Sequence, residues 1–305
     1  MAEGTACTIG TFDGIHLGHQ AILGRLNREA LRHRLERVAY AFAFPPRLAM
    51  QTPLKAGLLM PEGVKLRFLE RFADRVVRGH FARVRETTPE DFVADVLLAE
   101  LRARVVVVGE GFRFGHDRRG DVATLRSIGA VEGFSVIAVP PVMLEGEPVS
   151  STRIRRLLIA GDVEGSTSLL GRPPFLLGSV VPGDRLGQRL GYPTANLDLE
   201  RAVLRPKRGL YLAHACWPGN HGAGLLYIGE RPTVGGRGER CELHLLVSPA
   251  AELYGERMEV QLLERLRDDR AFPSEESLVG QITRDVAEAK RRILNHTATP
   301  EPIAA

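Results

Sequence analysis

The chain has 305 residues, of which 44% are hydrophobic and 26% are charged. This length is typical of two domains, and the composition excludes a disordered, fibrous or low-complexity protein. Lysine and arginine exceed the acidic residues by 41 − 37 = +4, but only 6% of the residues are aromatic. No basic run alternates with aromatic residues, so small anionic ligands are favoured over nucleic acid.

Targeting signals are also missing from the sequence. No stretch reaches 18 consecutive apolar residues, so we expect no membrane span. The first residues, MAEG, lack the basic start and apolar run of a signal peptide. The three cysteines, Cys7, Cys216 and Cys241, have no metal-binding spacing. We therefore expect a cytoplasmic protein with reduced thiols.

The first 140 residues alternate apolar strands with helical stretches. We expect strands at residues 6–10, 38–44, 105–108 and 134–139, and helices at residues 17–33, 64–72 and 89–101. Thr88 is positioned to cap the last of these helices, with Pro89 in its first turn. The β-branched run at 105–108 is typical of a strand that is buried on both faces of a parallel sheet. The alternation predicts a doubly wound α/β domain that binds ligands beyond the carboxyl ends of its strands.

The second half of the chain has shorter elements. Two short helices, broken at Gly161, precede a Gly/Pro-rich boundary at residues 171–174. Short apolar runs then predict strands of a compact β-barrel or sandwich at residues 176–181, 210–215, 225–228, 243–247 and 258–263. Ser274 starts a helix with one apolar stripe. We expect domains at residues 1–170 and 171–296, and a disordered tail at 297–305.

A glycine-bearing segment with two histidines, residues 10–19 (GTFDGIHLGH), follows the first strand and opens the first helix. Gly10 permits a tight turn, and the free N–H groups of a helix start favour a phosphate. His16 and His19 are three residues apart and face the same way, and Gly18 lets a nucleotide approach the backbone. Two imidazoles at such a site suit nucleotidyl transfer through charge stabilisation. The alternative is a pair of surface histidines after an ordinary turn.

This segment resembles the HxGH nucleotidyltransferase superfamily, and residues 149–155 (VSSTRIR) are similar to its second phosphate motif. The resemblance implies nucleotide contacts from Gly10, Phe12, Asp13, Gly18, Ser150, Ser151, Thr152 and Arg155. Residues 107–115 (VVGEGFRFG) look like a third motif, that of the bacterial bifunctional riboflavin kinase/FAD synthetase family. That likeness implies flavin contacts from Arg113 and Phe114. Taken alone, this last run would equally be a strand that ends in a glycine-rich loop.

Residues 187–197 (GQRLGYPTANL) resemble the signature of the riboflavin kinase domain. The resemblance implies that Thr194 and Asn196 bind Mg²⁺ and ATP phosphates, and that Gly178 and Gly187 contact the nucleotide. Mg²⁺ prefers hard oxygen ligands and keeps several waters, so a hydroxyl and an amide are suitable donors. The segment alone would be a turn between strands. Matching runs follow in order, however, at residues 206–211, 228–233, 242–246, 253–255, 266–272 and 281–285.

The same resemblance implies a general base in the run ELHLL, residues 242–246. Glu242 would take the proton from the terminal ribityl hydroxyl of riboflavin, and Arg231 would contact the flavin. The two-residue alternation of a strand puts Glu242 and His244 on one face. A carboxylate on the inner rim of a small barrel can be positioned for this role. The alternative is a solvated glutamate on an edge strand.

Residues 5–295 follow the motif order of the bifunctional family, in which a Rossmann-like adenylyltransferase domain precedes a Greek-key β-barrel kinase domain. The resemblance implies that the chain uses ATP and Mg²⁺ to convert riboflavin to FMN and FMN to FAD. It also implies a monomer or weak homo-oligomer that binds neither nucleic acid nor membrane.

Four positions depart from the family pattern. Pro45 stands where the family usually has His, and Gly111 where it has Asp or Asn. Val247 replaces a usual Asp, and Gln188 replaces a frequent Arg. Two alternatives therefore stay open, a kinase with a weakened or inactive adenylyltransferase domain and a non-enzymatic flavin-sensing protein.

Overall fold

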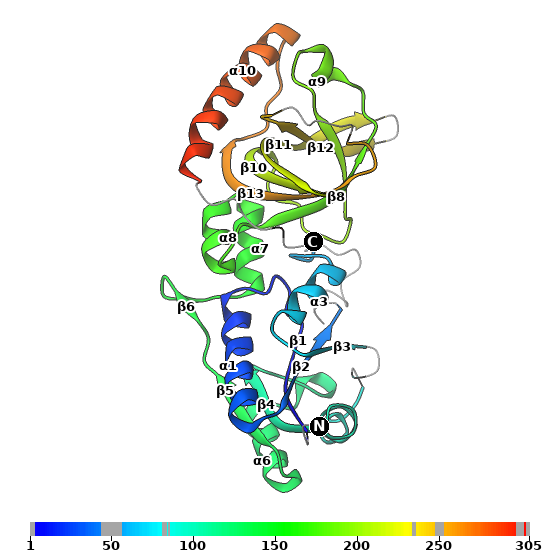
Figure 1. The fold of residues 1–305 in the computed structure, drawn as a ribbon, viewed down its shortest axis with the longest axis vertical. Coiled ribbons are helices and arrows are strands. Elements are labelled where there is room, and N and C mark those ends of the chain that lie inside the picture. The colour runs from blue at the N-terminus through cyan, green and yellow to red at the C-terminus, as the bar shows by residue number, and fades with distance from the viewer. Residues whose placement is uncertain are drawn as a thin grey trace. The chain divides into compact units, whose positions relative to one another are not determined.

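Figure 1 shows the computed structural model of the chain, which describes residues 4–43, 57–80, 84, 86–233, 236–247, 253–296 and 302. The chain divides into two compact units, Met1–Ser151 and Thr152–Ala305. The boundary expected from the sequence, at 170/171, differs from this division by two helices. Pro45 and, except for residue 302, the expected tail lie outside the described residues.

The first unit contains a parallel sheet of five strands. They are β1 (Thr5–Gly10), β2 (Glu36–Phe42), β3 (Arg75–Gly79), β4 (Ala103–Gly109) and β5 (Ser135–Val139). The strand order is β3-β2-β1-β4-β5, and every neighbouring pair is parallel. The chain reverses direction across the sheet between β1 and β4, and ligands of open α/β sheets bind at such a switch point. The doubly wound fold is confirmed.

Helices connect these strands. They are α1 (Leu17–His33), α3 (Glu62–Glu70), α5 (Pro89–Phe92) and α6 (Val122–Glu132), with a short 3₁₀ turn, η2 (His116–Arg118), before α6. The helix predicted at 17–33 is confirmed residue for residue. Thr88 caps α5 as predicted, because its hydroxyl accepts a hydrogen bond from the Asp91 N–H at 3.0 Å. The helix then continues as a π-helix, η1 (Val93–Glu100). A small hairpin, β6 (Met143–Leu144) and β7 (Glu147–Pro148), follows β5.

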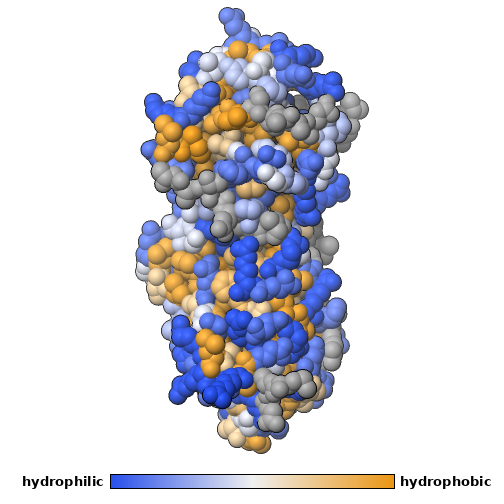
Figure 2. Space-filling view, viewed as in Figure 1, coloured by the Kyte–Doolittle hydropathy of each residue, from blue (hydrophilic) through white to orange (hydrophobic). Residues whose placement is uncertain are grey.

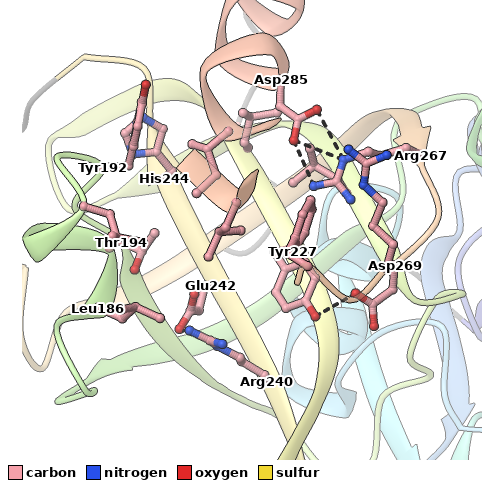
Figure 3. Close-up of a pocket in the computed structure, with 18 residues that line it drawn as sticks. Leu186, Tyr192, Thr194, Tyr227, Arg240, Glu242, His244, Arg267, Asp269 and Asp285 are labelled. Carbon is pink, nitrogen blue, oxygen red and sulfur yellow. Dashed lines mark hydrogen bonds and ion pairs between the residues drawn. The ribbon is translucent and has the colours of Figure 1, made fainter. Parts of the chain in front are cut away.

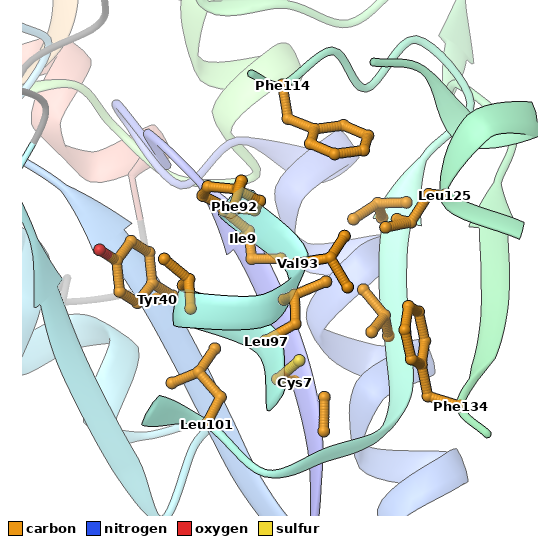
Figure 4. Close-up of a cluster of buried hydrophobic side chains, with 14 of the residues drawn as sticks. Cys7, Ile9, Tyr40, Phe92, Val93, Leu97, Leu101, Phe114, Leu125 and Phe134 are labelled. Carbon is orange, nitrogen blue, oxygen red and sulfur yellow. The ribbon is translucent and has the colours of Figure 1, made fainter. Parts of the chain in front are cut away.

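The core of the first unit lies between the sheet, η1 and α6 (Figure 4). Cys7 of β1, Leu97 of η1 and Leu125 of α6 are completely buried there. Burying one such leucine contributes roughly 1.5–3 kcal/mol. Burial also raises the pKa of the Cys7 thiol to about 12, which keeps it protonated and unreactive. This core fixes β1 and β4, whose carboxyl ends carry the histidine and glycine loops.

The second unit begins with two short helices and continues as a closed barrel. The helices α7 (Ser151–Ala160) and α8 (Val163–Leu170) are separated at Gly161, whose φ is +88°. The barrel strands are β8 (Phe175–Val181), β9 (Ala195–Leu199), β10 (Gly209–Trp217), β11 (Asn220–Thr233), β12 (Gly236–Leu245) and β13 (Arg257–Arg267). They close in the order β10-β11-β12-β9-β8-β13, with antiparallel neighbours throughout. The predicted β-barrel is confirmed.

A long C-terminal helix, α10 (Glu275–Arg292), packs on the outside of the barrel and ends in a short turn, η3 (Ile293–Asn295). The helix starts at Ser274, as the sequence predicted, and the structure adds a capping box there with Ser277. Tyr211 of β10 points into the barrel core, whereas Leu210 and Leu212 point outward and pack with Ala289 of α10. The alternation along β10 therefore gives this strand two buried faces.

Hydrophilic and hydrophobic residues are interspersed on the face of the molecule drawn in Figure 2. The large apolar side chains that are exposed lie on separate elements and loops. They are Leu31, Val131, Met143, Ile159, Val247, Tyr254 and Leu294. Among the described residues, no helix has the length and apolar character needed to cross a membrane.

Candidate active site

The barrel unit contains a cavity of about 250 Å³ that reaches from the strands to α10 (Figure 3). Its apolar lining comes from Leu186, Leu190, Leu210, Leu225, Phe272, Leu278 and Ile282. Its polar lining comes from Tyr192, Thr194, Tyr227, Arg240, Glu242, His244, Arg267, Asp269, Arg270 and Asp285. An apolar pocket with a few convergent polar groups is the usual form of a small-molecule site.

Glu242 lies on β12 and its side chain faces this cavity, with only 16% of it exposed. It pairs across the sheet with Asn196 of β9 on one side and with Tyr227 of β11 on the other. His244 lines the same cavity, as the alternation along the strand predicted. Arg240 donates its Nε–H to Glu242 Oε1 at 2.7 Å. The structure thus places a carboxylate next to the Thr-Ala-Asn segment that the sequence singled out.

The glycine-bearing segment before β9, which includes the one-turn helix α9 (Leu186–Arg189), packs directly against that strand. A Cβ on Gly183 would lie 2.0 Å from Asn196 Nδ2, and one on Gly187 would lie 3.0 Å from Thr194 Oγ1. Any larger residue would push the segment away from these two side chains. Gly187, Thr194, Asn196 and Glu242 therefore come together as expected. Their roles in binding and catalysis stay predictions.

Two other residues expected at this site lie elsewhere or are not described. Gly178 is in the middle of β8, where a Cβ would lie 2.9 Å from the Asp198 carbonyl oxygen of β9. This contact accounts for the glycine through strand packing. Gly178 is not among the residues that line the cavity. The side chain of Arg231 lies outside the described residues.

Ionic and polar pairs that sequence reasoning did not select also line the cavity. Arg267 donates to the Asp285 carboxylate of α10 from Nε and from Nη2, at 3.0 and 2.8 Å. Tyr227 donates its hydroxyl to Asp269 at 2.8 Å, and burial raises the pKa of Tyr227 to about 12. The matching runs at 266–272 and 281–285 contain three of these residues, Arg267, Asp269 and Asp285, but only the fold shows that they share one cavity.

A second cavity, of about 390 Å³, lies beside the first. The two share Tyr192, Thr194 and His244 as lining residues. The His244 ring is held in place because its Nδ1 forms a 2.8 Å hydrogen bond with the Pro193 carbonyl. The Tyr192 hydroxyl hydrogen-bonds Thr283 of α10 at 2.7 Å. Two pockets with a common wall can hold two reactants that meet at that wall.

In the first unit, the histidine segment follows β1 at the switch point. His16 caps α1 and accepts a 3.4 Å hydrogen bond from the His19 N–H through Nδ1. The two rings stack with their centroids 3.7 Å apart. A Cβ on Gly18 would lie 3.2 Å from the His16 ring. The i, i+3 pairing of the histidines that the sequence predicted is confirmed, and the absence of a side chain at Gly18 leaves room for that ring.

The backbone of this loop is strained. Phe12 and Ile15 are not glycines, but their φ angles are +48° and +40°. Such conformations cost of order 1–3 kcal/mol each and persist only where the surroundings enforce them. Phe12 and Ile15 are almost completely buried, which supplies that enforcement. Gly10 packs against the Phe12 ring, with a virtual Cβ 3.1 Å from it.

The second phosphate motif adjoins the first. Ser151 donates its hydroxyl to the Asp13 carbonyl at 2.8 Å, and the Val149 carbonyl lies 3.5 Å from a Cβ placed on Gly18. Asp13 is buried and its carboxylate accepts the Leu59 N–H at 2.9 Å. Residues 149–151 therefore lie beside the histidine loop, as the sequence led us to expect. Thr152 and Arg155 follow on α7, in the second unit.

Lys65 of α3 is a functional candidate that sequence reasoning missed. It is buried, with 2% exposed, and its ammonium donates to the carbonyls of Phe42 and Ala43 at the end of β2. Burial lowers the pKa of Lys65, although the Asp13 carboxylate opposes this shift. Burial, with smaller effects from His16 and Lys65, also lowers the pKa of His19 well below its usual value. His19 is therefore neutral at physiological pH.

The third motif forms the loop after β4. Phe114 is 6% exposed and packs against Phe92 and Phe112 in the core. Arg113 is exposed and pairs with Asp121 at 3.2 Å. Gly111 is exposed, and a Cβ there would meet no atom within 4 Å. The flavin contacts of Arg113 and Phe114 stay predictions.

Comparison with known proteins assigns each unit to a family. The FAD synthetase family matches residues 1–153 and the riboflavin kinase family matches residues 170–293. The bifunctional riboflavin kinase/FMN adenylyltransferase of Escherichia coli (strain K12) is 36% identical over 291 residues, covering 94% of this chain and 92% of that protein. The protein of the same name from Pseudomonas fluorescens is 38% identical over 303 residues, covering 94% and 93%.

A solved structure has the same overall fold. The crystal structure of a macrolide-efflux protein from Streptococcus pneumoniae superposes with a TM-score of 0.86 at 29% identity, covering 95% of each chain. The sequence relatives extend over both units in the same order. On these grounds the chain belongs to the bifunctional riboflavin kinase/FMN adenylyltransferase family, with FAD synthetase and riboflavin kinase domains.

Proposed function

We propose that the barrel cavity transfers the γ-phosphoryl group of ATP to riboflavin with Glu242 as the general base. The kinase and adenylyltransferase activities are those of the family to which the chain belongs. The position of Glu242 carries the residue assignment, because its carboxylate faces one of two cavities that meet at Thr194. Riboflavin would occupy the cavity beside α10, and ATP the cavity on the other side of Tyr192 and Thr194.

The kinase step needs few protein groups. Glu242 takes the proton from the terminal ribityl hydroxyl, and that oxygen attacks the γ-phosphorus of ATP. The bond from the γ-phosphorus to its bridging oxygen breaks, and ADP leaves with the electron pair. Glu242 of β12 is suitably placed for this role, because it pairs across the sheet with Asn196 of β9.

A magnesium ion fits the donor set beside Glu242. The Thr194 hydroxyl and the Asn196 amide are hard oxygen donors, and Mg²⁺ is commonly completed by substrate phosphates and water. Among the described residues, no cluster of three or more His, Cys, Asp or Glu forms a metal cage. Thr194 and Asn196 would hold the ion, which would neutralise the charge on the phosphates of ATP.

For the first unit, we propose adenylyl transfer to FMN at the histidine loop. A phosphate oxygen of FMN attacks the α-phosphorus of ATP, and pyrophosphate leaves. His16 and the start of α1 would stabilise the charge on the phosphates. Gly10, Phe12, Asp13 and Gly18 would shape the nucleotide pocket, and Ser150 and Ser151 would bind the outer phosphates. The phosphate contacts of Thr152 and Arg155 stay predictions from the sequence. Neutral His19 would act as a hydrogen-bonding group.

The proposal also covers the oligomeric state of the protein and its location in the cell. The chain would act as a monomer or weak homo-oligomer. The substrates ATP, riboflavin and FMN are soluble metabolites, which supports a cytoplasmic location. Sedimentation at enzyme concentrations used in assays would test the oligomeric state.

One experiment tests the kinase and adenylyltransferase proposals together. The purified chain is incubated with riboflavin, ATP and Mg²⁺, and the flavins are separated by chromatography. We expect FMN and FAD from the wild type. Glu242→Gln should lower FMN formation by about 10²–10⁴-fold, the usual worth of a positioned base, while FMN supplied directly is still converted to FAD. Near-normal FMN formation by Glu242→Gln would remove this residue from the mechanism.

A further inference from the structure

Arg240 and Glu242 form an ion pair that lines the barrel cavity in which we place riboflavin (Figure 3). They are two residues apart on β12 and therefore share one face of the strand. The Arg240 Nε–H donates to Glu242 Oε1 at 2.7 Å, and the two side chains are 31% and 16% exposed. A guanidinium carries five N–H donors in a fixed fork. The remaining donors of Arg240 make no other hydrogen bond to the described residues.

Phosphoryl transfer moves negative charge away from Glu242. When the carboxylate takes a proton it becomes neutral, and its ion pair with Arg240 is lost. The new phosphate ester forms on the oxygen that gave up this proton, which lies within hydrogen-bond distance of the carboxylate. The transferred group therefore forms next to a cation that has just lost its partner.

We propose that Arg240 moves from Glu242 to the transferred phosphoryl group, so that it holds the base before the reaction and the phosphate of FMN after it. This proposal rests on the proposed kinase function. The step balances as written above, because the ribityl proton goes to Glu242 and ADP takes the electron pair of the broken bond. Arg240 exchanges one anion for another and takes part in no bond breaking.

Three variants of the full chain test this role. Arg240→Gln keeps a hydrogen-bond donor without charge, and Arg240→Lys keeps the charge without the fork. Arg257→Gln is the matched control, because Arg257 pairs with Glu200 at 3.1 Å on the barrel surface and lines neither cavity. The kcat and KM for riboflavin are measured from FMN formation, and the Kd of riboflavin and of FMN is measured by flavin fluorescence.

For Arg240→Gln we expect kcat to fall by about 10²-fold, as for loss of one preorganised donor to a transition state. The KM for riboflavin should stay within about threefold, and the Kd of FMN should weaken about tenfold more than that of riboflavin. Arg240→Lys should recover part of both losses.

Two results would overturn the proposal. One is a kcat and an FMN affinity in Arg240→Gln that match the wild type. The other is an equal loss of kcat in the Lys and Gln variants with an unchanged ratio of the FMN and riboflavin Kd values, which would make the pair a structural contact only. Failure of the kinase function itself looks different, because the wild type would then form no FMN. The ratio of FMN to riboflavin affinity would still test Arg240 in that case.

Discussion

At position 111 a hydrogen atom stands where the family that the sequence resembles has Asp or Asn. Gly111 lies in the loop after β4, and its φ is not among the positive values in the chain. A side chain there would meet no atom within 4 Å. The structure therefore has room for a side chain at position 111, and an asparagine there would need no strained backbone.

We expect Gly111→Asn to raise the rate of FAD formation from FMN, by up to roughly 10²-fold, because it adds a donor beside the switch point. FMN formation should not change. Gly24→Asn is the control, since Gly24 also has open space but lies in α1 away from this loop. A wild type that forms FAD as fast as FMN, with no gain in Gly111→Asn, would contradict the interpretation that this glycine weakens the site.

His19 supplies a prediction about pH. Its pKa in the folded chain lies well below the usual value, chiefly because the ring is buried. The unfolded chain therefore binds a proton at this histidine below pH of about 6.5, whereas the folded chain does not. Protonation favours the unfolded state, so the stability of the first unit should fall as the pH drops below that value.

The His19→Gln variant should lose less stability than the wild type between pH 6.5 and pH 5. Thermal unfolding followed by circular dichroism measures this difference. The only tryptophan of the chain, Trp217, lies on β10, so its fluorescence reports on the barrel as an internal reference. His80→Gln, at an exposed position of the same unit, should leave the pH dependence unchanged. Parallel curves for His19→Gln and the wild type would contradict the prediction.

At the scale of elements, two ion pairs join β13 to α10, Arg267 with Asp285 and Glu264 with Arg292, and the first of them lies at the barrel cavity. Arg267 and Asp285 are 19% and 10% exposed, and Arg267 binds the carboxylate through two nitrogens. Asp285→Ala leaves the Arg267 guanidinium without its carboxylate partner beside the barrel cavity. We expect the free energy of unfolding of the barrel to fall by roughly 3 kcal/mol. The KM for riboflavin should rise as well.

Denaturant unfolding followed by Trp217 fluorescence measures this loss. Glu200→Ala is the control, since it breaks an ion pair with Arg257 in which both side chains are about half exposed. Its effect should not exceed about 1 kcal/mol. If the two variants lost equal stability, the buried ion pair of Asp285 would contribute no more to stability than the exposed pair of Glu200.

The elements show how far sequence reasoning reaches. The helix at 17–33, the break at Gly161 and the cap at Ser274 were predictable because local signals set them. β3 (RVVRG) was missed because it has neither a long apolar run nor alternation. α6 (VATLRSIGAVE) was missed although it has a local start signal, since Asp121 caps it by accepting the Thr124 N–H at 2.9 Å.

The candidate sites divide in the same way. The motifs located Glu242 and the histidines, since these residues stand in recognisable runs. Lys65 carries no local signal, because only the packing of α3 against the end of β2 buries its ammonium. The pairing of Arg240 with Glu242 was equally hidden, since it depends on which face of β12 lines the cavity. Position 240 lies outside every run that the sequence resemblance used.

At the scale of the whole molecule, the division after Ser151 leads to a prediction about fragments. α8 belongs to the barrel unit, and its Val163 is completely buried in the barrel core cluster. A fragment of residues 152–305 should therefore fold and form FMN at a rate close to that of the full chain. A fragment of residues 171–305 lacks Val163 and should unfold at a lower temperature.

Tryptophan fluorescence on heating and the riboflavin assay compare the two fragments. Equal melting temperatures would show that α7 and α8 do not support the barrel, and would favour the domain boundary at 170/171 expected from the sequence. An inactive and unfolded 152–305 fragment would show that the barrel needs the first unit.

The two sheets also differ in whether they have edge strands. The barrel is closed, so every one of its described strands has neighbours on both sides. The parallel sheet ends at β3, whose Arg75 and Arg78 form ion pairs with Glu36 and Glu62, and at β5, whose residues SVIAV carry no charge. An uncharged, apolar edge strand is a template for pairing with another chain. On heating or long storage, aggregation would therefore start at β5, and a lysine placed on that strand would delay it.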